Sequence, residues 1–393
     1  MKELLEQARA LAPEIVRWRR HIHENPEVGG DLPDTCAYVT DELKKMGYQP
    51  YPVGGGVVAM LDGDPDGKVI LLRADMDALP LVEDTGEPFS SKRPGAMHAC
   101  GHDTHTAMLL GAARLLMDNR DKVHGRVKFM FQPGEEGYKG ALHMVEAGLL
   151  EDPNVDAAFG MHSAPASDFE TGTVTHTIGP ANASADGFRI TVHGRGSHGS
   201  RPEDGIDPIN VLAHIVIALQ AINSRERNQK EPLILTCGQI SAGTAENIIP
   251  ESGFITGTIR AFNQEVREQA KRRLVEISDL TARTFGAGAE VEWYTEFAPT
   301  INDIPLTEEL DGYTRELLGD DQVKIQPAQM GSEDFSEVML RVPGTFFNLS
   351  LGSKAAGYTF GAHNPKVRHD EAGLPVGSAV YANIAIEWLA HNR

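Results

Sequence analysis

The feature that most constrains the fold is a change in the pattern of apolar residues near Ala185. Before this point, short apolar runs alternate with helical segments, and the clearest runs are Val69–Leu72, Val127–Phe131 and Ala157–Met161. A helix is predicted between the first two, from about Thr104 to Met117. Continuous apolar strands that alternate with helices are typical of an α/β fold built on a largely parallel sheet. We therefore predict such a layer for the first part of the chain.

After Ala185 the order of the predicted elements is different. Phe188–Val192 alternates apolar and polar residues, as a half-exposed strand does. The next segments predict a helix, two strands, a helix and a strand, over Asp207–Asn223, Leu233–Ile240, Gly253–Phe262, Asn263–Phe285 and Ala289–Tyr294. This β-α-β-β-α-β order is the ferredoxin-like pattern. After Pro299 the α/β character returns, and the chain ends in a predicted helix, Val376 to Ala390.

These patterns predict two domains, the number that a chain of 393 residues favours. We expect a discontinuous α/β domain formed by residues 1–184 and 298–393. A ferredoxin-like α+β domain, residues 185–297, is expected as an insertion between its two parts. An insertion of this length is large enough to form a domain with a core of its own.

Charge, apolar runs and cysteine content restrict the partners and the location that we expect for this chain. The formal net charge is −20, from 36 basic and 56 acidic residues, which argues against binding to nucleic acids or to anionic membranes. Residues 1–20 contain no continuous apolar run, so no signal peptide is expected. The longest apolar stretch, Ala107–Met117, is too short to cross a bilayer. An odd number of cysteines favours a reducing, cytoplasmic location, and they are Cys36, Cys100 and Cys237.

Three predicted strands are followed by metal-capable side chains, which are Asp75 and Asp77, Glu135 and Glu136, and His162. A fourth segment, His98–Asp103, contains Cys100 and His102 and directly precedes a predicted helix. Ligands of open α/β sheets lie beyond the carboxyl ends of the strands. We therefore expect these side chains to converge at one edge of the sheet.

Each of these segments also has a structural interpretation. An Asp-x-Asp after a strand is more often a capped turn, Cys100 could be a buried cysteine beside a capping loop, and His162 could be a core histidine. Glu135 and Glu136, however, would repel each other at a buried strand end unless a cation compensates them. Structural zinc usually has a closed shell of four Cys or His ligands. A mixed set with a spare glutamate indicates a catalytic site with an open position.

The motifs that carry these residues resemble those of the M20 metallopeptidase family, within it the branch of hippurate hydrolases, N-acyl-amino-acid amidohydrolases and auxin-conjugate hydrolases. The resemblance covers essentially the whole chain. Its motifs are Arg20–Glu27, Arg73–Pro80, His98–Asp103, Phe131–Glu136, Gly194–His198, Asn247–Pro250, Gly257–Arg260, Gly331–Phe335 and Gly361–His363. The segment Gly29–Thr35 departs from the family's usual acidic run, away from the metal motifs.

The resemblance implies a catalytic domain that holds two divalent metal ions (Zn, Co, Mn or Ni) through Cys100, His102, Glu136, His162 and His363. Other branches have histidine at the position of Asp75 and aspartate at that of Cys100. In this branch the Cys100 thiolate bridges the metals, which keep it deprotonated, and thiolate and imidazole suit these ions. Asp75 and Asp77 are then expected to orient ligands through hydrogen bonds.

The resemblance also implies roles in catalysis. Glu135 is the expected general base, which moves a proton from water to the leaving amine. His198, on the inserted lid and dimerisation domain and often supplied by a partner subunit, is the expected oxyanion donor. Asn247 and Arg260 are expected to bind the α-carboxylate of the substrate. Three of these residues also have a structural interpretation. Glu135 could be an exposed acid in a turn, His198 a histidine of a surface loop and Arg260 a salt-bridged residue of a strand.

The predicted function is metal-dependent hydrolysis of the amide bond of N-acetyl or N-benzoyl amino acids by a homodimer or homotetramer. An N-acetyl-diaminopimelate deacetylase or a dipeptidase on the same scaffold is the alternative among enzymes. A non-catalytic metal-dependent binding protein has no use for Glu135 beside Glu136. A redox sensor built on Cys100 lacks a resolving cysteine nearby in the sequence.

Overall fold

The computed structural model describes the backbone of residues 2–393 and the side chains from Glu3 onward. Chain contacts divide it into two compact units. Unit 1 contains the residues up to Gly179 together with Ile301–Pro327 and Asp334–Arg393, and unit 2 contains Pro180–Thr300 and Ala328–Glu333. Unit 2 is thus a few residues wider than the expected insertion, 185–297.

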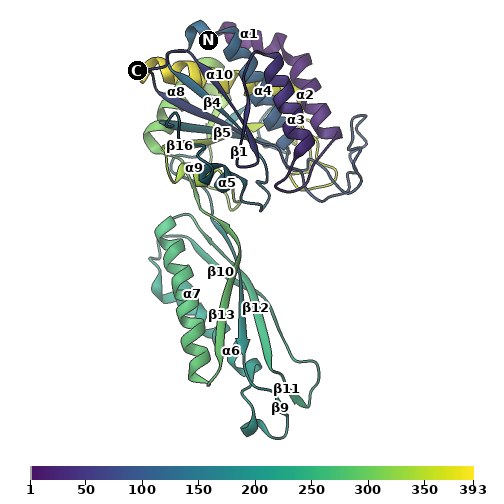
Figure 1. Cartoon of the computed structure of the whole chain (residues 1–393), viewed down its shortest axis with the longest axis vertical. Coiled ribbons are helices and arrows are strands. Elements are labelled where there is room, and N and C mark those ends of the chain that lie inside the picture. Colours follow the sequence, from purple (N-terminus) through teal and green to yellow (C-terminus); the bar gives the residue numbers. More distant parts are fainter. Residues whose placement is uncertain (1) are drawn as a thin grey trace. The chain divides into compact units, whose positions relative to one another are not determined.

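Unit 1 is built on an eight-stranded sheet with the order β1-β2-β4-β3-β5-β16-β6-β15. Figure 1 labels β1, β4, β5 and β16 of this sheet. Its strands are β1 (Tyr51–Val53), β2 (Gly56–Asp62), β3 (Val69–Asp75), β4 (Arg126–Gln132), β5 (Ala157–Ala164), β6 (Val174–His176), β15 (Val323–Ile325) and β16 (Gly344–Ser350). β3 pairs in parallel with β4 and β5, and β16 in parallel with β5. β1, β2 and β4 pair antiparallel with one another in turn. The predicted mixed α/β fold with a mostly parallel central sheet is confirmed.

Helices cover both faces of this sheet. They are α1 (Lys2–Ala10), α2 (Ala12–Glu24), α3 (Pro33–Lys45), α4 (His102–Asp118), α5 (Gly140–Glu146), α8 (Ile304–Leu318), α9 (Ser336–Met339) and α10 (Leu374–His391). Successive side chains of a strand point to opposite faces. Ile70 and Leu72 accordingly belong to the core with α4 and α10, whereas Leu71 packs with Met144 of α5 and Val338 of α9. This double burial explains why residues 69–72 of β3 form a continuous apolar run.

Unit 2 is a four-stranded antiparallel sheet with the order β10-β12-β8-β13. Its strands are β8 (Ala185–His193), β10 (Leu233–Ala242), β12 (Ser252–Ala261) and β13 (Gly288–Phe297), and its long helices are α6 (Pro208–Ala221) and α7 (Gln264–Thr284). The order along the chain is the β-α-β-β-α-β order expected from the sequence. Short strands β9 (Ser197–His198) and β11 (Ile248–Ile249) pair with each other, as do β7 (Pro180–Asn182) and β14 (Thr300–Ile301). That this unit acts as a lid stays a prediction.

The core of unit 2 lies between its sheet and its two helices. Phe188, Ile190 and Val192 of β8 pack against Leu212 of α6 and Leu274 of α7. These strand residues are spaced by two, so the half-exposed alternation in the sequence corresponds to one face turned toward the helices. None of the described helices of either unit combines the length and the apolar character that a membrane crossing requires.

A buried ion pair joins α7 to β8. The Arg267 guanidinium donates to both carboxylate oxygens of Asp186, at 2.8 and 2.7 Å, and both residues are buried. Lys271 Nζ lies 3.3 Å from the same carboxylate. Two parallel N–H···O bonds fix the orientation of both groups as well as their separation.

We expect Arg267→Ala to lower the free energy of unfolding of unit 2 by about 3–5 kcal/mol, because it leaves a buried carboxylate without its main partner. Urea unfolding followed by the fluorescence of Trp293, the tryptophan of this unit, measures the change. Arg283→Ala is the control, since it removes an exposed pair with Asp279 on the same helix and should cost at most about 0.5 kcal/mol. Equal losses in the two variants would contradict a special role for the buried pair.

Candidate metal centre

Metal-capable side chains gather where the central parallel strands of unit 1 end. β3 ends at Asp75, β5 carries His162 near its end, and Glu135 and Glu136 follow β4 after a turn. Cys100 precedes α4 by one residue, Gly101, whose φ is +96°. A Cβ at Gly101 would lie 2.3 Å from Ser163 Oγ, so only glycine allows α4 to begin this close to β5.

The structure brings the five residues expected as ligands together. Cys100 Sγ lies 3.4 Å from His162 Nε2 and 3.3 Å from His363 Nε2. His363 Nε2 lies in turn 3.2 Å from Glu136 Oε1. Ligand atoms within 4.8 Å of one another form two triads, one of Cys100, His102 and His162 and one of Cys100, Glu136 and His363. Cys100 therefore belongs to both triads.

The donor set fits a divalent cation. Both ring nitrogens of buried His102 lack a hydrogen bond among the described residues, although carboxylates surround the ring. Asp77 Oδ1 is 3.3 Å from Nδ1, while Asp75 Oδ2 and Glu135 Oε2 are 3.6 and 3.8 Å from Nε2. Buried polar groups without partners need an explanation. Thiolate, imidazole and carboxylate groups around one point are the ligands that zinc and its neighbours prefer in proteins.

The charges of the candidate ligands favour positive charge on the histidines and negative charge on Cys100. Burial raises the pKa of the Cys100 thiol, but His162 and His102 outweigh it and bring this pKa down to about 6. Burial likewise lowers the pKa of His162, yet the thiolate raises it to about 9. Hydrogen bonds to Cys100 and Glu136 raise the pKa of His363 to about 10. The negative charge that holds protons on these imidazoles would also stabilise a bound cation.

Two features hold the glutamates and His363 in place. Asp77 accepts hydrogen bonds from the backbone N–H groups of Glu135 and Glu136, at 2.9 and 3.0 Å, which fixes the turn after β4. His363 has a φ of +64°, a conformation that is unfavourable for any residue with a Cβ. Its backbone N–H donates to Ala99 O at 2.8 Å. Strained backbone of this kind is concentrated at functional sites.

The other predicted site residues belong to unit 2 and lie at two different ends of it. His198 is exposed on β9, and its Nδ1 accepts hydrogen bonds from Ser200 N (3.1 Å) and Ser200 Oγ (2.8 Å). Its Nε2 is therefore the protonated nitrogen. Asn247 O accepts a bond from Gly199 N at 2.8 Å, so Asn247 lies beside His198.

Arg260 lies near the opposite end of unit 2. Ser252 and Arg260 are eight residues apart on β12, about 26 Å at about 3.3 Å per residue, and Asn247 lies beyond Ser252. Arg260 Nη1 donates to Met330 O at 3.3 Å. Within one chain an extended strand thus separates Asn247 from Arg260. That both residues bind the α-carboxylate of the substrate stays a prediction.

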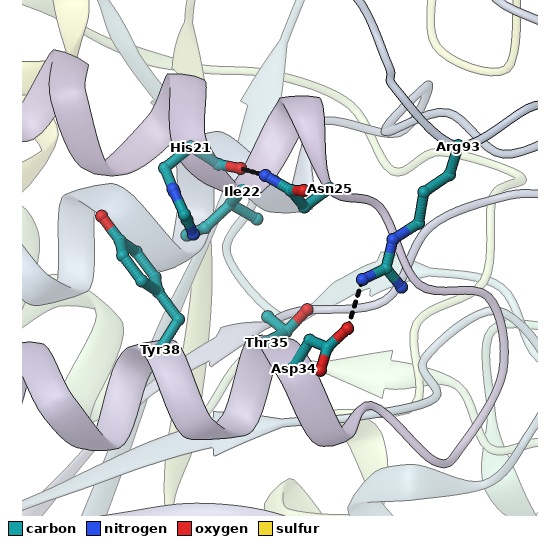
Figure 2. A pocket seen from close by; sticks show the side chains of 7 residues that line it. All are labelled: His21, Ile22, Asn25, Asp34, Thr35, Tyr38 and Arg93. Carbon is teal, nitrogen blue, oxygen red and sulfur yellow. Dashed lines mark hydrogen bonds and ion pairs between the residues drawn. The ribbon is translucent and has the colours of Figure 1, made fainter.

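A cavity of about 230 Å³ lies elsewhere in unit 1 and contains none of the predicted ligands (Figure 2). His21 stacks on Tyr38 at one end, with ring centroids 3.8 Å apart, and Arg93 lies at the other. Arg93 pairs with Asp34 and Glu27, so the charges around the cavity compensate one another. The cavity therefore gives no indication of substrate chemistry.

Sequence reasoning missed His105, a fully buried residue on the first turn of α4. Its Nδ1 lies 2.6 Å from Asp75 Oδ1, and its ring centroid lies 4.5 Å from that of His162. The spacing contained a signal, since residues three apart on a helix lie on one face, and His105 follows His102 by three.

Comparison with known proteins agrees with this geometry. Residues 71–387 match the model of peptidase family M20/M25/M40. N-acetyl-L-cysteine deacetylase of Bacillus subtilis is 39% identical over 340 residues, which cover 86% of this chain and 80% of the relative. Thermostable carboxypeptidase 1 of Saccharolobus solfataricus is 37% identical, with 99% and 98% covered. IAA-amino acid hydrolase ILR1-like 4 of Arabidopsis thaliana is 38% identical, with 95% and 86% covered.

Solved structures are similar over the whole chain. A structure from methicillin-resistant Staphylococcus aureus is 29% identical, with a TM-score of 0.93 over 99% of this chain and all of the other. The YXEP protein of Bacillus subtilis, described as a dinuclear metal-binding peptidase of the M20 family, is 33% identical, with a TM-score of 0.82 over 97% and 99% of the two chains. The resemblance predicted from the motifs is thus confirmed: the chain belongs to peptidase family M20/M25/M40 and is a metal-dependent amidohydrolase.

Proposed function

We propose that the protein hydrolyses the amide bond of N-acyl amino acids of the N-acetyl or N-benzoyl type and releases the free amino acid and a carboxylic acid. The observation that carries this proposal is the pair of triads that share Cys100, with Glu135 beside them. Relatives named for the deacetylation of N-acetyl-L-cysteine and for the hydrolysis of IAA–amino acids support the substrate class. The relative named as a carboxypeptidase supports the dipeptidase alternative.

The residues that would hold two divalent metal ions are Cys100, His102, Glu136, His162 and His363. When bound, such ions lower the pKa of a water molecule and polarise the carbonyl of the substrate. Zn, Co, Mn and Ni are the candidates, because thiolate and imidazole ligands suit all four. Cys100 would contribute to holding both ions, since its Sγ belongs to both triads.

Glu135 is the proposed general base. It is buried, and its Oε2 lies 3.8 Å from Nε2 of the candidate ligand His102. Its carboxylate accepts a proton from the attacking water and transfers that proton to the leaving nitrogen, so that the amine departs neutral. Asp77 keeps Glu135 in reach by fixing the backbone of the turn.

Unit 2 supplies the proposed groups that touch the substrate. His198 donates its Nε2–H to the developing oxyanion, a role that the bonds from Ser200 to its Nδ1 prepare. Arg260 binds the α-carboxylate with two parallel N–H groups. An N-acyl amino acid is far shorter than the length of β12 that separates Arg260 from His198. We therefore propose that a second copy of the chain supplies His198 and Asn247 to each site, in a homodimer or a homotetramer of such pairs.

A substrate panel tests the proposed function. We expect the metal-loaded enzyme to hydrolyse N-acetyl and N-benzoyl amino acids faster than dipeptides. Analogues with an amidated carboxyl group should be hydrolysed at least tenfold more slowly than the free acids, since a tenfold change corresponds to about 1.4 kcal/mol for one lost carboxylate contact. Chelation should abolish turnover, and Zn²⁺, Co²⁺, Mn²⁺ or Ni²⁺ should restore it. Liquid chromatography of the products measures both. Faster cleavage of dipeptides would favour the alternative, and full activity in protein shown by elemental analysis to be metal-free would exclude the metal mechanism.

We expect Cys100→Ser to weaken metal binding and to lower kcat strongly, because a hydroxyl is a poorer bridge than a thiolate. Cys36→Ser is the control: it removes another thiol from unit 1, one that is partly buried and lies outside the triads. Metal content by elemental analysis and turnover of an N-acetyl amino acid measure the effects. Similar behaviour of the two variants would rule out a bridging role for Cys100.

Subunit mixing tests the proposed sharing of sites. His198→Ala and Glu135→Gln should each be nearly inactive and should each retain bound metal. A mixed dimer contains one site in which both residues are intact. If half of the dimers are mixed and one of their two sites works, mixing the two inactive proteins should restore about a quarter of wild-type activity. Native mass spectrometry confirms that subunits have exchanged. Absence of recovery after exchange would place His198 in the site of its own chain.

A further inference from the structure

Three buried residues form a chain of hydrogen bonds behind the candidate metal centre. Asp75 ends β3, His105 lies on the first turn of α4, and Ser163 follows His162 on β5. His105 Nδ1 lies 2.6 Å from Asp75 Oδ1. On the other side of the ring, Nε2 lies 2.7 Å from Ser163 N and 2.9 Å from Ser163 Oγ. All three residues are at most 1% exposed. One imidazole thus connects Asp75 of β3 with the two elements, α4 and β5, that carry the candidate ligands His102 and His162.

The protonation of His105 follows from its partners. The backbone N–H of Ser163 can only donate, so Nε2 accepts and carries no proton. The single ring proton is therefore on Nδ1 and is donated to Asp75 Oδ1. Because both nitrogens are occupied, His105 is not available as a metal ligand, although its atoms lie near those of Asp75 and His102. Its ring is fixed in one tautomer and one orientation.

Both ends of this chain reach candidate ligands. Asp75 Oδ2 lies 2.9 Å from Arg73 Nη1 and 3.6 Å from His102 Nε2, so the carboxylate that His105 orients faces His102. At the other end, Ser163 O accepts a hydrogen bond of 2.6 Å from His162 Nδ1. That bond leaves His162 Nε2 to face Cys100 Sγ. The backbone of Ser163 therefore positions both His105 and His162.

We propose that His105 is a positioning residue that holds Asp75 against His102 and sets the separation of His102 from His162, and thereby the metal affinity of the centre. This inference rests on the proposed metal centre. Partners of this kind behind metal-binding histidines typically change metal affinity by about 10–100-fold when they are removed. A purely structural role would instead resemble that of His176, which is also buried in unit 1 and lies outside the triads. Its Nε2 donates to Asp311 Oδ1 at 2.7 Å.

The test compares His105→Leu and His105→Asn with His176→Leu, the matched loss of a buried histidine bonded to an aspartate. Either change at His105 breaks the link, since leucine has no polar atoms and asparagine is too short to reach both Asp75 and Ser163. We expect the His105 variants to bind Co²⁺ at least about tenfold more weakly by calorimetry. The thiolate-to-Co²⁺ absorption band and the d–d bands should shift as well. The His176 variant should retain wild-type affinity and spectra even if its melting temperature falls.

The outcomes separate the two proposals. If the wild-type protein binds no Co²⁺, the metal centre itself is refuted. If the wild type binds Co²⁺ and folded His105 variants keep its affinity and spectra, the positioning role is refuted while the metal centre stands. Equal loss of affinity in the His176 variant would also refute it, because the effect would then follow from lost stability. Circular dichroism shows which variants fold, and the asparagine variant decides the question if the leucine variant does not.

Discussion

The structure of the site depends on the position of one sulfur atom between three imidazole rings. Cys100 Sγ belongs to a triad with His102 and His162 and to another with Glu136 and His363. A neutral thiol could not compensate positive charge on both sides, whereas a thiolate can, and the histidines lower the pKa of Cys100 to about 6 despite its burial. The close start of α4, which only Gly101 permits, keeps His102 within reach of this sulfur.

The same concentration of acidic groups needs support from the sheet below it. Arg73 is buried on β3 and donates to Gln132 Oε1 at 2.8 Å, while its other nitrogens lie 2.9 Å from Asp75 and 3.3 Å from Asp334. Asp334 also accepts from Gln132 Nε2 at 2.6 Å and from Ala141 N at 3.0 Å. A buried guanidinium with several acceptors offsets part of the repulsion between neighbouring carboxylates. The network also fixes the side-chain direction of Asp75, on which His105 and His102 depend.

Much of this arrangement could be predicted because the relevant patterns are local. The apolar runs of β3, β4 and β5 are continuous, and the polar residues that follow them stand where parallel strands deliver side chains. The pairing of β16 with β5 was not predictable in the same way, since it joins residues almost 190 positions apart and leaves no local pattern. His105 escaped notice because its partners come from two other strands. Its spacing from His102 indicates a shared helix face, but its bond with the backbone N–H of Ser163 leaves no mark in the side-chain sequence.

The separation of Asn247 from Arg260 shows a further limit of reading spacing from sequence. A spacing of thirteen positions suggests that these two residues are neighbours. Most of the residues between them form β12, however, and the ends of an extended strand lie far apart. The two motifs Gly194–His198 and Asn247–Pro250, fifty positions apart, instead meet through the pairing of β9 with β11. The strand thus separates the residues proposed to bind the substrate into two sets, with His198 and Asn247 toward one end of β12 and Arg260 near the other. Because an N-acyl amino acid is much shorter than β12, the proposal that both sets bind one substrate is consistent only with the further proposal that they come from two chains.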